Sequence, residues 1–298
     1  MRVFVTGATG FIGAAVVSEL LAAAHTVLGL ARSDAGTETL KRLGAEVHRG
    51  DLSDLESLAA GARASDGVIH LAFIHDFHNS ARSIEADRSA IRAMTRALEG
   101  SGKPFVGTSG TALLAPGRTG IEADAPPTEG HVHPRAVAEG LVLGAVERGV
   151  KASLVRLAPT VHGHGDHGFV PFLIQIARQK GVAGYLGGGS NRWPAVHRLD
   201  AARLFRLVLE TAPAGSRFHG VAEEGIPMRT IAETIGKGLG IPARSIPPVQ
   251  ASAHFDWMAL FVGLDNPTTS ALTRESLRWK PDHPGLLTDL RENGYFVS

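Results

Sequence analysis

The spacing of hydrophobic and polar positions in the first half of the chain alternates between two periods. Short runs rich in Val, Ile, Leu and Phe are typical of β-strands, and longer runs with apolar residues every three or four positions are typical of helices. The predicted strands span residues 2–7, 25–31, 45–51, 66–72, 103–110 and 151–159. The predicted helices span residues 11–24, 35–44, 52–62, 82–102 and 131–148, with Ser53 as the expected N-cap of the third.

Strict alternation of strands and helices predicts βαβ units, and therefore a parallel sheet with helices on both faces. The expected fold class is α/β, with a doubly wound parallel sheet of Rossmann type. The alternation weakens after about residue 165, where the pattern still predicts helices at 168–181, 200–212 and 225–240. Sheets of this kind bind ligands outside the carboxyl ends of their strands, so the candidate residues are those that follow each strand.

Composition removes several classes of function. The absence of cysteine excludes disulfides, thiolate metal sites and a cysteine nucleophile. A net charge of +1 gives no reason to expect nucleic acid or a membrane as a partner. The chain starts directly in a strand-like run, without a signal-peptide pattern, and its apolar runs are too short to span a bilayer. A cytoplasmic protein is therefore expected.

The glycine motif TGATGFIG lies between the first predicted strand and the first predicted helix. In this spacing Gly7 permits a tight turn, Gly10 lets the backbone approach a pyrophosphate, and Gly13 lets the helix pack closely on the strand. The free N–H groups of the helix start suit phosphates. The motif predicts a dinucleotide cofactor, with a ligand-free turn as the alternative. The other cofactor-binding residues expected within it are Thr9, Phe11 and Ile12.

The residues after the second and third strands bear on the choice of cofactor. Arg32 and Ser33 come first after the second strand, and an acidic residue, Asp34, comes only later. A guanidinium and a hydroxyl suit a 2′-phosphate, so NADP(H) is expected in preference to NAD(H), unless Arg32 is only a solvated loop charge. Asp51 and Leu52 are expected beside the adenine, and a turn or capping role is the alternative for Asp51.

These motifs resemble the extended short-chain dehydrogenase/reductase family, which includes nucleotide-sugar epimerases and dehydratases. The resemblance covers most of the chain and rests on TGATGFIG, GDLSD, VIHLA, FVGTSG, LVRLAPTVHG and AVHRLDAARL. It implies a dinucleotide-binding domain at 1–160, which the chain rejoins at about 194–212, and a smaller, mainly substrate-binding C-terminal region at 161–298. Further cofactor-binding residues implied by the resemblance are Leu71, Ala72, Thr108, Arg135, Pro159 and His162.

The catalytic signature of that family, Y-x-x-x-K, is absent, because neither Tyr185 nor Tyr295 has a lysine four residues later. Counting back from Glu139, which matches a glutamate common in the family, His131 falls on the tyrosine position and Arg135 on the lysine position. The chain resembles an atypical subgroup with H-x-x-x-R at this place. A histidine can move a proton near neutral pH, whereas an arginine can only bind ribose hydroxyls or polarise an oxyanion.

Several points at the catalytic position stay open at this stage. Ser109 and Thr111 flank Gly110, which occupies the family's serine position, and either hydroxyl is a candidate to orient the substrate oxygen. Pro134 places the helix start near itself, which leaves His131 in the preceding loop. The stretch HVHPR is then either a rebuilt catalytic segment or only a polar helix start, and His133 is a second candidate imidazole.

The expected substrate is a small, fairly apolar ketone, aldehyde or alcohol. Trp193 stands where nucleotide-sugar enzymes of the family have an arginine, four residues before the histidine of V-H-x-x-D. No metal is expected, because the histidines of HGHGDHG, residues 162–168, lack a zinc-site spacing. The expected pocket residues are His75, Phe77, Leu113, Phe169 and Trp193, with Phe73 and Phe172 nearby.

Three functions remain open on the sequence. The first is an NADP-dependent oxidoreductase with His131 as proton carrier. The second is an NADP-binding sensor or partner-binding module without catalysis, and the third is an epimerase or dehydratase that uses its nicotinamide transiently. The helices at 82–100 and 131–148 resemble the pair that forms the family's dimer interface, which implies a homodimer.

Overall fold

The computed structural model describes residues 1–74, 80–129 and 133–297. Its central sheet has seven strands, all parallel, in the order β10-β6-β5-β4-β1-β2-β3. The direction of the strand order reverses between β1 and β4, which confirms the doubly wound sheet predicted from the alternation. These strands are β1 (Arg2–Thr6), β2 (Thr26–Ala31), β3 (Glu46–Arg49), β4 (Gly67–His70), β5 (Pro104–Gly110), β6 (Lys151–Leu157) and β10 (Arg217–Gly220).

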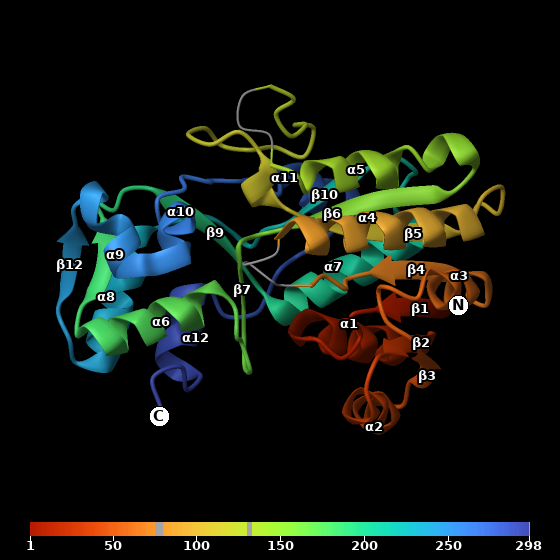
Figure 1. Cartoon of the computed structure of the whole chain (residues 1–298), viewed down its shortest axis with the longest axis horizontal. Coiled ribbons are helices and arrows are strands. Elements are labelled where there is room, and N and C mark those ends of the chain that lie inside the picture. The colour runs from red at the N-terminus through yellow and green to blue at the C-terminus, as the bar shows by residue number, and fades with distance from the viewer. Residues whose placement is uncertain (75–79, 130–132, 298) are drawn as a thin grey trace.

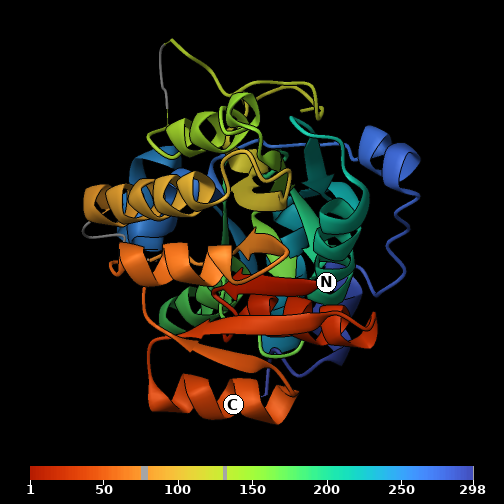
Figure 2. The ribbon, with the colours of Figure 1, turned by 90° about the vertical axis from the view of Figure 1, so that its right-hand side faces the viewer.

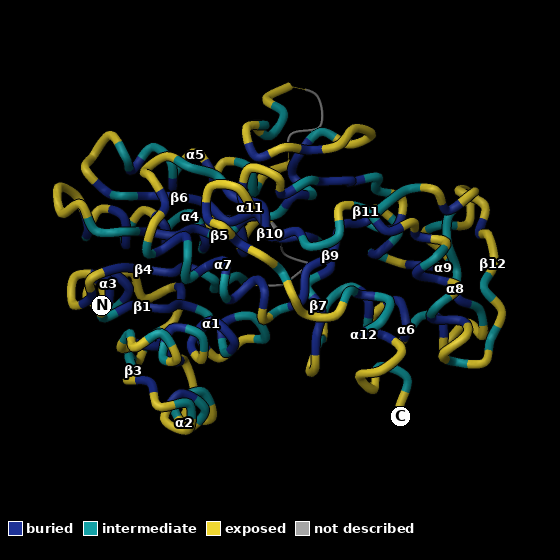
Figure 3. Tube along the Cα trace, turned by 180° about the vertical axis from the view of Figure 1, so that it is seen from behind, coloured by how far each residue is buried: buried dark blue, intermediate teal, exposed yellow. Residues whose placement is uncertain are grey.

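Helices cover both faces of this sheet (Figure 1). One hydrophobic core holds side chains of α1 (Phe11–Ala22), α2 (Asp34–Leu43) and α7 (Arg198–Thr211) against the strands. The other core holds side chains of α3 (Leu55–Arg63), α4 (Ser80–Ala97) and α5 (Ala136–Leu143). Figure 2 shows α2 at the lower edge, beside β2 and β3. The inner strands are buried on both faces, as the dark blue trace in Figure 3 shows, which explains their continuous apolar runs.

Three predicted helix starts differ from the structure by three residues or more. The helix predicted at 225–240 is α8 (Met228–Leu239), and the residues before it belong to a strand. Helix α3 begins at Leu55 with Asp54 as its N-cap, whose carboxylate accepts a hydrogen bond from the N–H of Ser57, so Ser53 as the N-cap was wrong. Helix α5 was predicted to span 131–148 but begins at Ala136 and ends at Leu143. A separate 3-10 turn, η2 (Val146–Arg148), follows it.

The C-terminal region lies beyond the carboxyl ends of the central strands and is connected to them through β7 and β9 (Figure 1). It contains a three-stranded sheet, β11-β9-β7, and a parallel pair, β12-β8. The strands are β7 (Thr160–His162), β8 (Ala183–Leu186), β9 (Arg192–His197), β11 (Glu223–Pro227) and β12 (Ala243–Ile246). The helices and 3-10 turns outside the first half are α6 (Phe169–Lys180), α8 (Met228–Leu239), η3 (Pro248–Gln250), α9 (Ala251–Phe255), η4 (Asp256–Met258), α10 (Ala259–Val262), α11 (Ala271–Leu277) and α12 (Leu286–Glu292). In the described ranges no helix is both long and apolar enough to cross a membrane.

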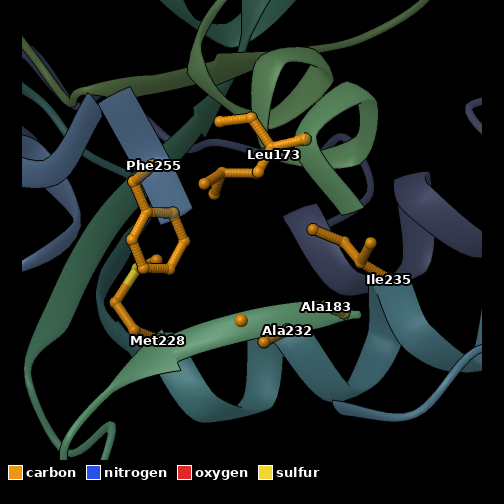
Figure 4. A pocket seen from close by; sticks show the side chains of 8 residues that line it. Leu173, Ala183, Met228, Ala232, Ile235 and Phe255 are labelled. Atoms are coloured by element: carbon orange, nitrogen blue, oxygen red, sulfur yellow. The ribbon is translucent and has the colours of Figure 1, made fainter. Parts of the chain in front are cut away.

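The C-terminal region has a hydrophobic core of its own. A closed cavity of about 10 Å³ lies in this core (Figure 4). It has room for no more than a single water molecule, and its apolar lining offers such a molecule no side-chain hydrogen-bond partner. It is therefore not a substrate site. The lining residues are Leu173, Ile176, Ala183, Gly184, Met228, Ala232, Ile235 and Phe255.

Candidate functional site

The three glycines of the TGATGFIG motif differ in what an added Cβ atom would contact. Gly7 has a φ of +68°, and a Cβ at this position would lie 2.8 Å from the backbone nitrogen of Ala72, just after β4. A Cβ at Gly13 would lie 1.9 Å from the carbonyl oxygen of Gly7, so only glycine lets α1 pack this closely. A Cβ at Gly10 would meet only the Gly7 oxygen, at 3.2 Å, and otherwise open space. The motif therefore forms an open cradle.

The N-terminus of α1 points into this cradle without a capping side chain. Its N-cap is Gly10, which makes no side-chain cap, and its first turn holds no acidic residue. The next two helices differ, because Ser33 caps α2 and Asp54 caps α3, and each of these helices has an acidic residue in its first turn. Thr9 and Gly10 are exposed. Free N–H groups and the positive end of the helix dipole fit the pyrophosphate of a dinucleotide.

The residues after β2 present a positive surface beside this cradle. Arg32 is exposed, and the Ser33 hydroxyl oxygen accepts a hydrogen bond from the N–H of Gly36 at 3.2 Å, which leaves its own hydrogen available. The carboxylate of Asp34 is paired with Arg49 at 3.1 Å. Asp34 is therefore partly neutralised, and Asp51 is a second acid whose charge acts on Arg32. The exposed arginine and the free hydroxyl hydrogen fit a phosphate on the ribose.

Asp51 forms a turn after β3. Its carboxylate accepts hydrogen bonds from the N–H of Ser53, at 2.7 Å, and from the Ser53 hydroxyl, at 2.6 Å. These two bonds, opposed by partial burial, hold the pKa of Asp51 below its usual value. Leu52 is buried under the turn. The carboxylate has a local structural role, and the contact of this turn with adenine stays a prediction.

A buried polar network fixes the end of β4 under the cradle, and it was not predicted from the sequence. The His70 ring lies between the Thr6 hydroxyl, 2.7 Å from Nδ1, and the Asp87 carboxylate, 3.2 Å from Nε2. The Thr6 oxygen also accepts from the N–H of Ala72, and Thr108 donates to the carbonyl of His70. Leu71 is half-buried at the same strand end. The network holds this strand end against the glycine motif.

The two hydroxyls considered for substrate orientation point into the protein. Ser109 donates a hydrogen bond of 2.6 Å to the Glu139 carboxylate, which also forms a bidentate ion pair with the fully buried Arg156. Thr111 donates to the side-chain oxygen of Asn266 at 2.8 Å and is fully buried. For either hydroxyl to orient a substrate, it would have to leave a buried partner.

Arg135 precedes α5 and lies over an aromatic ring. Its guanidinium carbon is 3.9 Å from the centroid of the Phe73 ring, after β4, which is a cation–π contact. Burial lowers the pKa of Arg135, while the nearby charges of Asp87 and Glu139 raise it, and the group remains a cation. The structure thus places the positive charge of Arg135 beside the segment that follows β4, and its correspondence to the family's lysine stays a prediction.

Other predicted residues are placed less directly. His131, His75 and Phe77 lie outside the described residues. Leu113 is buried in the 3-10 turn η1 (Thr111–Leu113), which follows β5. Pro159 is half-buried between β6 and β7.

His162 is buried, 1% exposed, at the end of β7, and its Nδ1 lies 2.8 Å from the Asp289 carboxylate. Its Nε2 makes no hydrogen bond within the described part of the chain. The ring is the first of three, because His197 lies 5.4 Å away, edge to face, and His283 stacks on His197 at 4.8 Å. Burial, with the two neighbouring imidazoles, lowers the pKa of His197 to about 4. Residues of the C-terminal region, Asp289 and His197, thus hold the ring of His162 in place.

An aromatic cluster lies at the start of α6. Phe169 contacts Phe261 at 4.7 Å and Trp193 at 5.8 Å between ring centroids, and Phe172 contacts Trp257 at 5.2 Å. Phe172 is 37% exposed, whereas Trp193 is buried and donates to the carbonyl of Phe261. Trp257 and Phe261 were not predicted as members of this cluster, although the apolar run WMALFV contains both.

Arg192 is committed to an ion pair beside this cluster. Its guanidinium forms two hydrogen bonds, 3.1 and 3.0 Å, with the carboxylate of Asp265, and its backbone N–H donates a third, 2.8 Å, to the same group. The pair holds the pKa of Asp265 below its usual value. The ion pair offsets the charge of Arg192, whose side chain remains 41% exposed, and Trp193 is buried.

Among the residues that the structure describes, the clustered metal-ligating atoms do not belong to the loop HGHGDHG. They belong to Asp200, Asp282 and His283, and lie within 4.8 Å of one another. Asp200 already accepts hydrogen bonds from the His283 ring and from two backbone N–H groups. These contacts give the cluster a structural role at the start of α7.

Comparisons with known proteins agree with this fold. Residues 3–219 match the family model described as NAD dependent epimerase/dehydratase. Two uncharacterized proteins are similar over nearly the whole chain. One, from Saccharomyces cerevisiae, is 49% identical over 98% of this chain and 99% of its own length, and the other, from Schizosaccharomyces pombe, is 48% identical over 99% and 100%.

More distant similarities extend to proteins with named activities. A ketoreductase of Stigmatella aurantiaca, named for a 4-hydroxy-2-methyl-3-oxo-4-farnesyl-3,4-dihydroquinoline-1-oxide, is 28% identical over 87% of this chain and 82% of its own. A dTDP-glucose 4,6-dehydratase of Streptomyces venezuelae, solved with NAD bound, has the same fold, with a TM-score of 0.78. It is 20% identical, and the match covers 99% of this chain and 96% of that one.

Proposed function

This chain belongs to the NAD-dependent epimerase/dehydratase family, a family that uses NAD(P), and we propose that it is an NADP-dependent oxidoreductase of a small, fairly apolar carbonyl or alcohol substrate. The observation that carries the proposal is the uncapped N-terminus of α1, which opens onto the cradle of Gly7, Gly10 and Gly13. Anionic phosphates are the ligands that such a helix end favours.

NADP(H) is the cofactor that the charges beside the cradle favour. Arg32 is an exposed cation, and Ser33 keeps a hydrogen to donate, while Arg49 neutralises the nearby Asp34. A 2′-phosphate would accept from Arg32 and Ser33, whereas the 2′-hydroxyl of NAD would find Asp34, the first acid after β2, already paired. These residues support NADP(H) over NAD(H).

The substrate class follows from the walls of the aromatic cluster. Phe169, Phe172 and Trp257 offer apolar ring surface next to the cofactor side of the C-terminal region. The ion pair with Asp265 offsets the charge of Arg192, which disfavours this arginine as a clamp for the pyrophosphate of a nucleotide sugar. The similarity to a ketoreductase whose named substrate carries a farnesyl group supports an apolar substrate as well.

In the proposed reaction a bound nicotinamide supplies a hydride to the carbonyl carbon, or accepts one from the alcohol carbon. His131 would donate the proton to the carbonyl oxygen in reduction, or remove it from the alcohol in oxidation. Arg135 remains charged and cannot relay a proton, so its role is to hold ribose hydroxyls or the substrate oxygen by its positive charge.

The test compares His131→Ala with His133→Ala, its neighbour in the same stretch. We expect His131→Ala to lower turnover at least ~100-fold and to leave NADPH affinity nearly unchanged, because general acid–base catalysis contributes about that much. His133→Ala should retain turnover. Normal turnover in His131→Ala would remove His131 from the mechanism, and a loss confined to His133→Ala would transfer the role to His133.

A second candidate is an NADP-binding protein without catalysis. It is favoured by the engagement of Ser109 with Glu139 and of Thr111 with Asn266, together with the missing tyrosine. Calorimetric titration with NADPH and a hydride-transfer assay over a panel of ketones and alcohols separate the two. Tight binding without oxidation of NADPH, and without reduction of NADP, on any member of the panel supports this second function.

A further inference from the structure

Tyr295 joins the C-terminus of the chain to the glycine-rich loop after β7. Its hydroxyl oxygen accepts a hydrogen bond from the N–H of Gly163 at 3.0 Å. The hydroxyl hydrogen can be donated to the Asp166 carboxylate, at 3.1 Å, or to the Gly163 carbonyl, at 3.2 Å. Burial raises the pKa of Tyr295 strongly, so this hydrogen is retained at every physiological pH. One hydroxyl therefore fixes both ends of the turn 163–166.

Asp289 supplies a second attachment to the same loop. Its side chain is fully buried on α12, and its carboxylate pairs with His162 at the end of β7. The other carboxylate oxygen accepts from the side chain of Asn293, which holds the end of α12 in place. Tyr295 lies 3.4 Å from the same carboxylate. The two attachments form one connected group of polar side chains.

The loop 162–168 has little conformational preference of its own. Gly163 has a φ of +138° and Gly165 a φ of +82°, values that glycine adopts readily and other residues rarely do. Within the loop, the N–H of Asp166 donates to the carbonyl of Gly163, and the N–H of Gly168 donates to the Asp166 carboxylate. The ring of His167 also lies 3.3 Å from the carbonyl oxygen of Gly165. Contacts from residues 289 and 295, more than 120 positions away, add to these local hydrogen bonds in fixing the conformation of the loop.

The loop in turn contacts the cofactor cradle. The ring of His167 lies edge to face on Phe11, 5.7 Å between ring centroids, and Phe11 is the first residue of α1, directly after Gly10. The guanidinium carbon of Arg198 lies 5.2 Å from the centroid of the same ring. Phe11 is thus held on one side by the loop and approached by a cation from the start of α7.

We propose that Tyr295 and Asp289 form a C-terminal clasp, which positions the loop 162–168 against Phe11 and thereby sets the affinity of the cradle for its cofactor. Both are positioning residues, since they act through the loop. The proposal rests on the proposed NADP(H) binding for its second half. Because linkage is reciprocal, cofactor binding must also tighten the clasp.

The test compares Tyr295→Phe with Tyr185→Phe, the same change at the chain's other tyrosine, which lies on β8. Binding of NADPH and of NADH is measured by calorimetry, and amide hydrogen exchange is measured with and without NADPH. We expect Tyr295→Phe to weaken NADPH binding about 10-fold and to speed exchange in 163–168. We expect Tyr185→Phe to change neither, and NADPH to slow exchange in 286–295 of the unaltered chain.

Several outcomes overturn the proposal. Unchanged NADPH affinity in Tyr295→Phe, with a lowered melting temperature, would assign the residue to stability alone. Unchanged exchange in 163–168 of the unliganded variant would show that the clasp does not hold the loop. If the unaltered chain binds neither NADPH nor NADH, the proposed function fails, and exchange in the unliganded proteins still decides whether the clasp positions the loop.

A second variant covers the case in which Tyr295→Phe does not fold. Asp166→Ala removes one acceptor of the Tyr295 hydroxyl and, within the loop, the acceptor of the Gly168 N–H, and it leaves the C-terminal residues intact. We expect the same direction of change in NADPH affinity and in exchange over 163–168. A folded Asp166→Ala protein with the affinity and exchange of the unaltered chain would contradict the clasp.

Discussion

The cofactor end and the catalytic end of the candidate site are built differently. The cradle consists of backbone, and its shape depends on three glycines within seven positions, Gly7, Gly10 and Gly13. The catalytic end depends on side chains whose partners are remote in the sequence, as Thr111 and Asn266 are. A site of the first kind is encoded locally and is recognised by its motif, whereas a site of the second kind can lose its chemistry while the motif and the fold persist.

Gly13→Ala tests whether the glycines alone determine the shape of the cradle. It is the substitution for which we expect the largest loss of stability and of NADPH binding. The added Cβ would meet the Gly7 oxygen at 1.9 Å, so the helix and the turn must separate. We expect a loss of several kcal/mol in the free energy of unfolding, since overpacking against backbone is costly, and no measurable NADPH binding. Urea unfolding and calorimetric titration measure both quantities.

Gly140→Ala is the matched control for this substitution. Gly140 is an exposed position inside α5, and a Cβ there meets nothing within 4 Å. Alanine should raise the free energy of unfolding by about 0.5–1 kcal/mol, through its helix propensity. A Gly13→Ala protein with ordinary NADPH affinity would show that the cradle is not the cofactor site.

His197→Asn tests the contacts between residues that are far apart in the sequence, here the contacts of His197 with His162 and His283. The pKa of His197 is lowered to about 4 in the folded protein, so the unfolded chain binds more protons between pH 6.5 and 4, and stability falls as the pH falls through that window. Asparagine retains an acceptor for the N–H of Leu199 but does not titrate. Between pH 6.5 and pH 4, we expect the free energy of unfolding to fall less in the variant than in the unaltered protein, by on the order of 3 kcal/mol.

The measurement is the free energy of unfolding from urea curves at several pH values between 4 and 8. The folded unaltered protein should become less stable below pH 6.5, and the variant should have a flatter profile over the same window. Identical profiles for the two proteins would mean that burial and the neighbouring rings of His162 and His283 do not keep His197 neutral.

Arg32→Ala carries the smallest effect and separates the two cofactors. Removal of a charged donor from a phosphate costs about 1.5 kcal/mol, which corresponds to a loss of NADPH affinity of about 10-fold. NADH affinity should not change. Arg42→Ala, an exposed arginine on the far part of α2, is the control and should bind both cofactors normally. Equal losses for NADPH and NADH in Arg32→Ala would contradict the NADP preference.

The fold of the first half could be predicted because each element carries its own period. The strands of the C-terminal region could not, because β7, β9 and β11 are three to six residues long and are stabilised by partners far along the chain. The same holds for β10, which completes the central sheet with only four residues. The pattern placed the start of α5 at residue 131, whereas Pro134, which suits the first turn of a helix, indicated a start close to the observed one at Ala136.

The candidate site also has a part that could be predicted from local sequence and a part that could not. The glycine motif contains within itself the reasons for its conformation, so its geometry could be predicted. Nothing near Ser109 in the sequence indicates that its hydroxyl is bound by Glu139, which itself pairs with Arg156 on another strand. The contact of Tyr295 with the loop 162–168 joins segments more than 120 residues apart, and no local pattern indicates it.

The three tryptophans differ in burial, so one of them, Trp257, can serve as an intrinsic fluorescent probe. Trp193 and Trp279 are 1% and 0% exposed, so solvent and ligands do not reach their rings directly, whereas Trp257 is half-buried within the aromatic cluster. A molecule that enters the cluster would shift or quench the emission of Trp257 in particular. Binding of compounds can therefore be screened by tryptophan fluorescence without an activity assay. NADPH absorbs where tryptophan emits, so its binding would be detected as energy transfer from tryptophan.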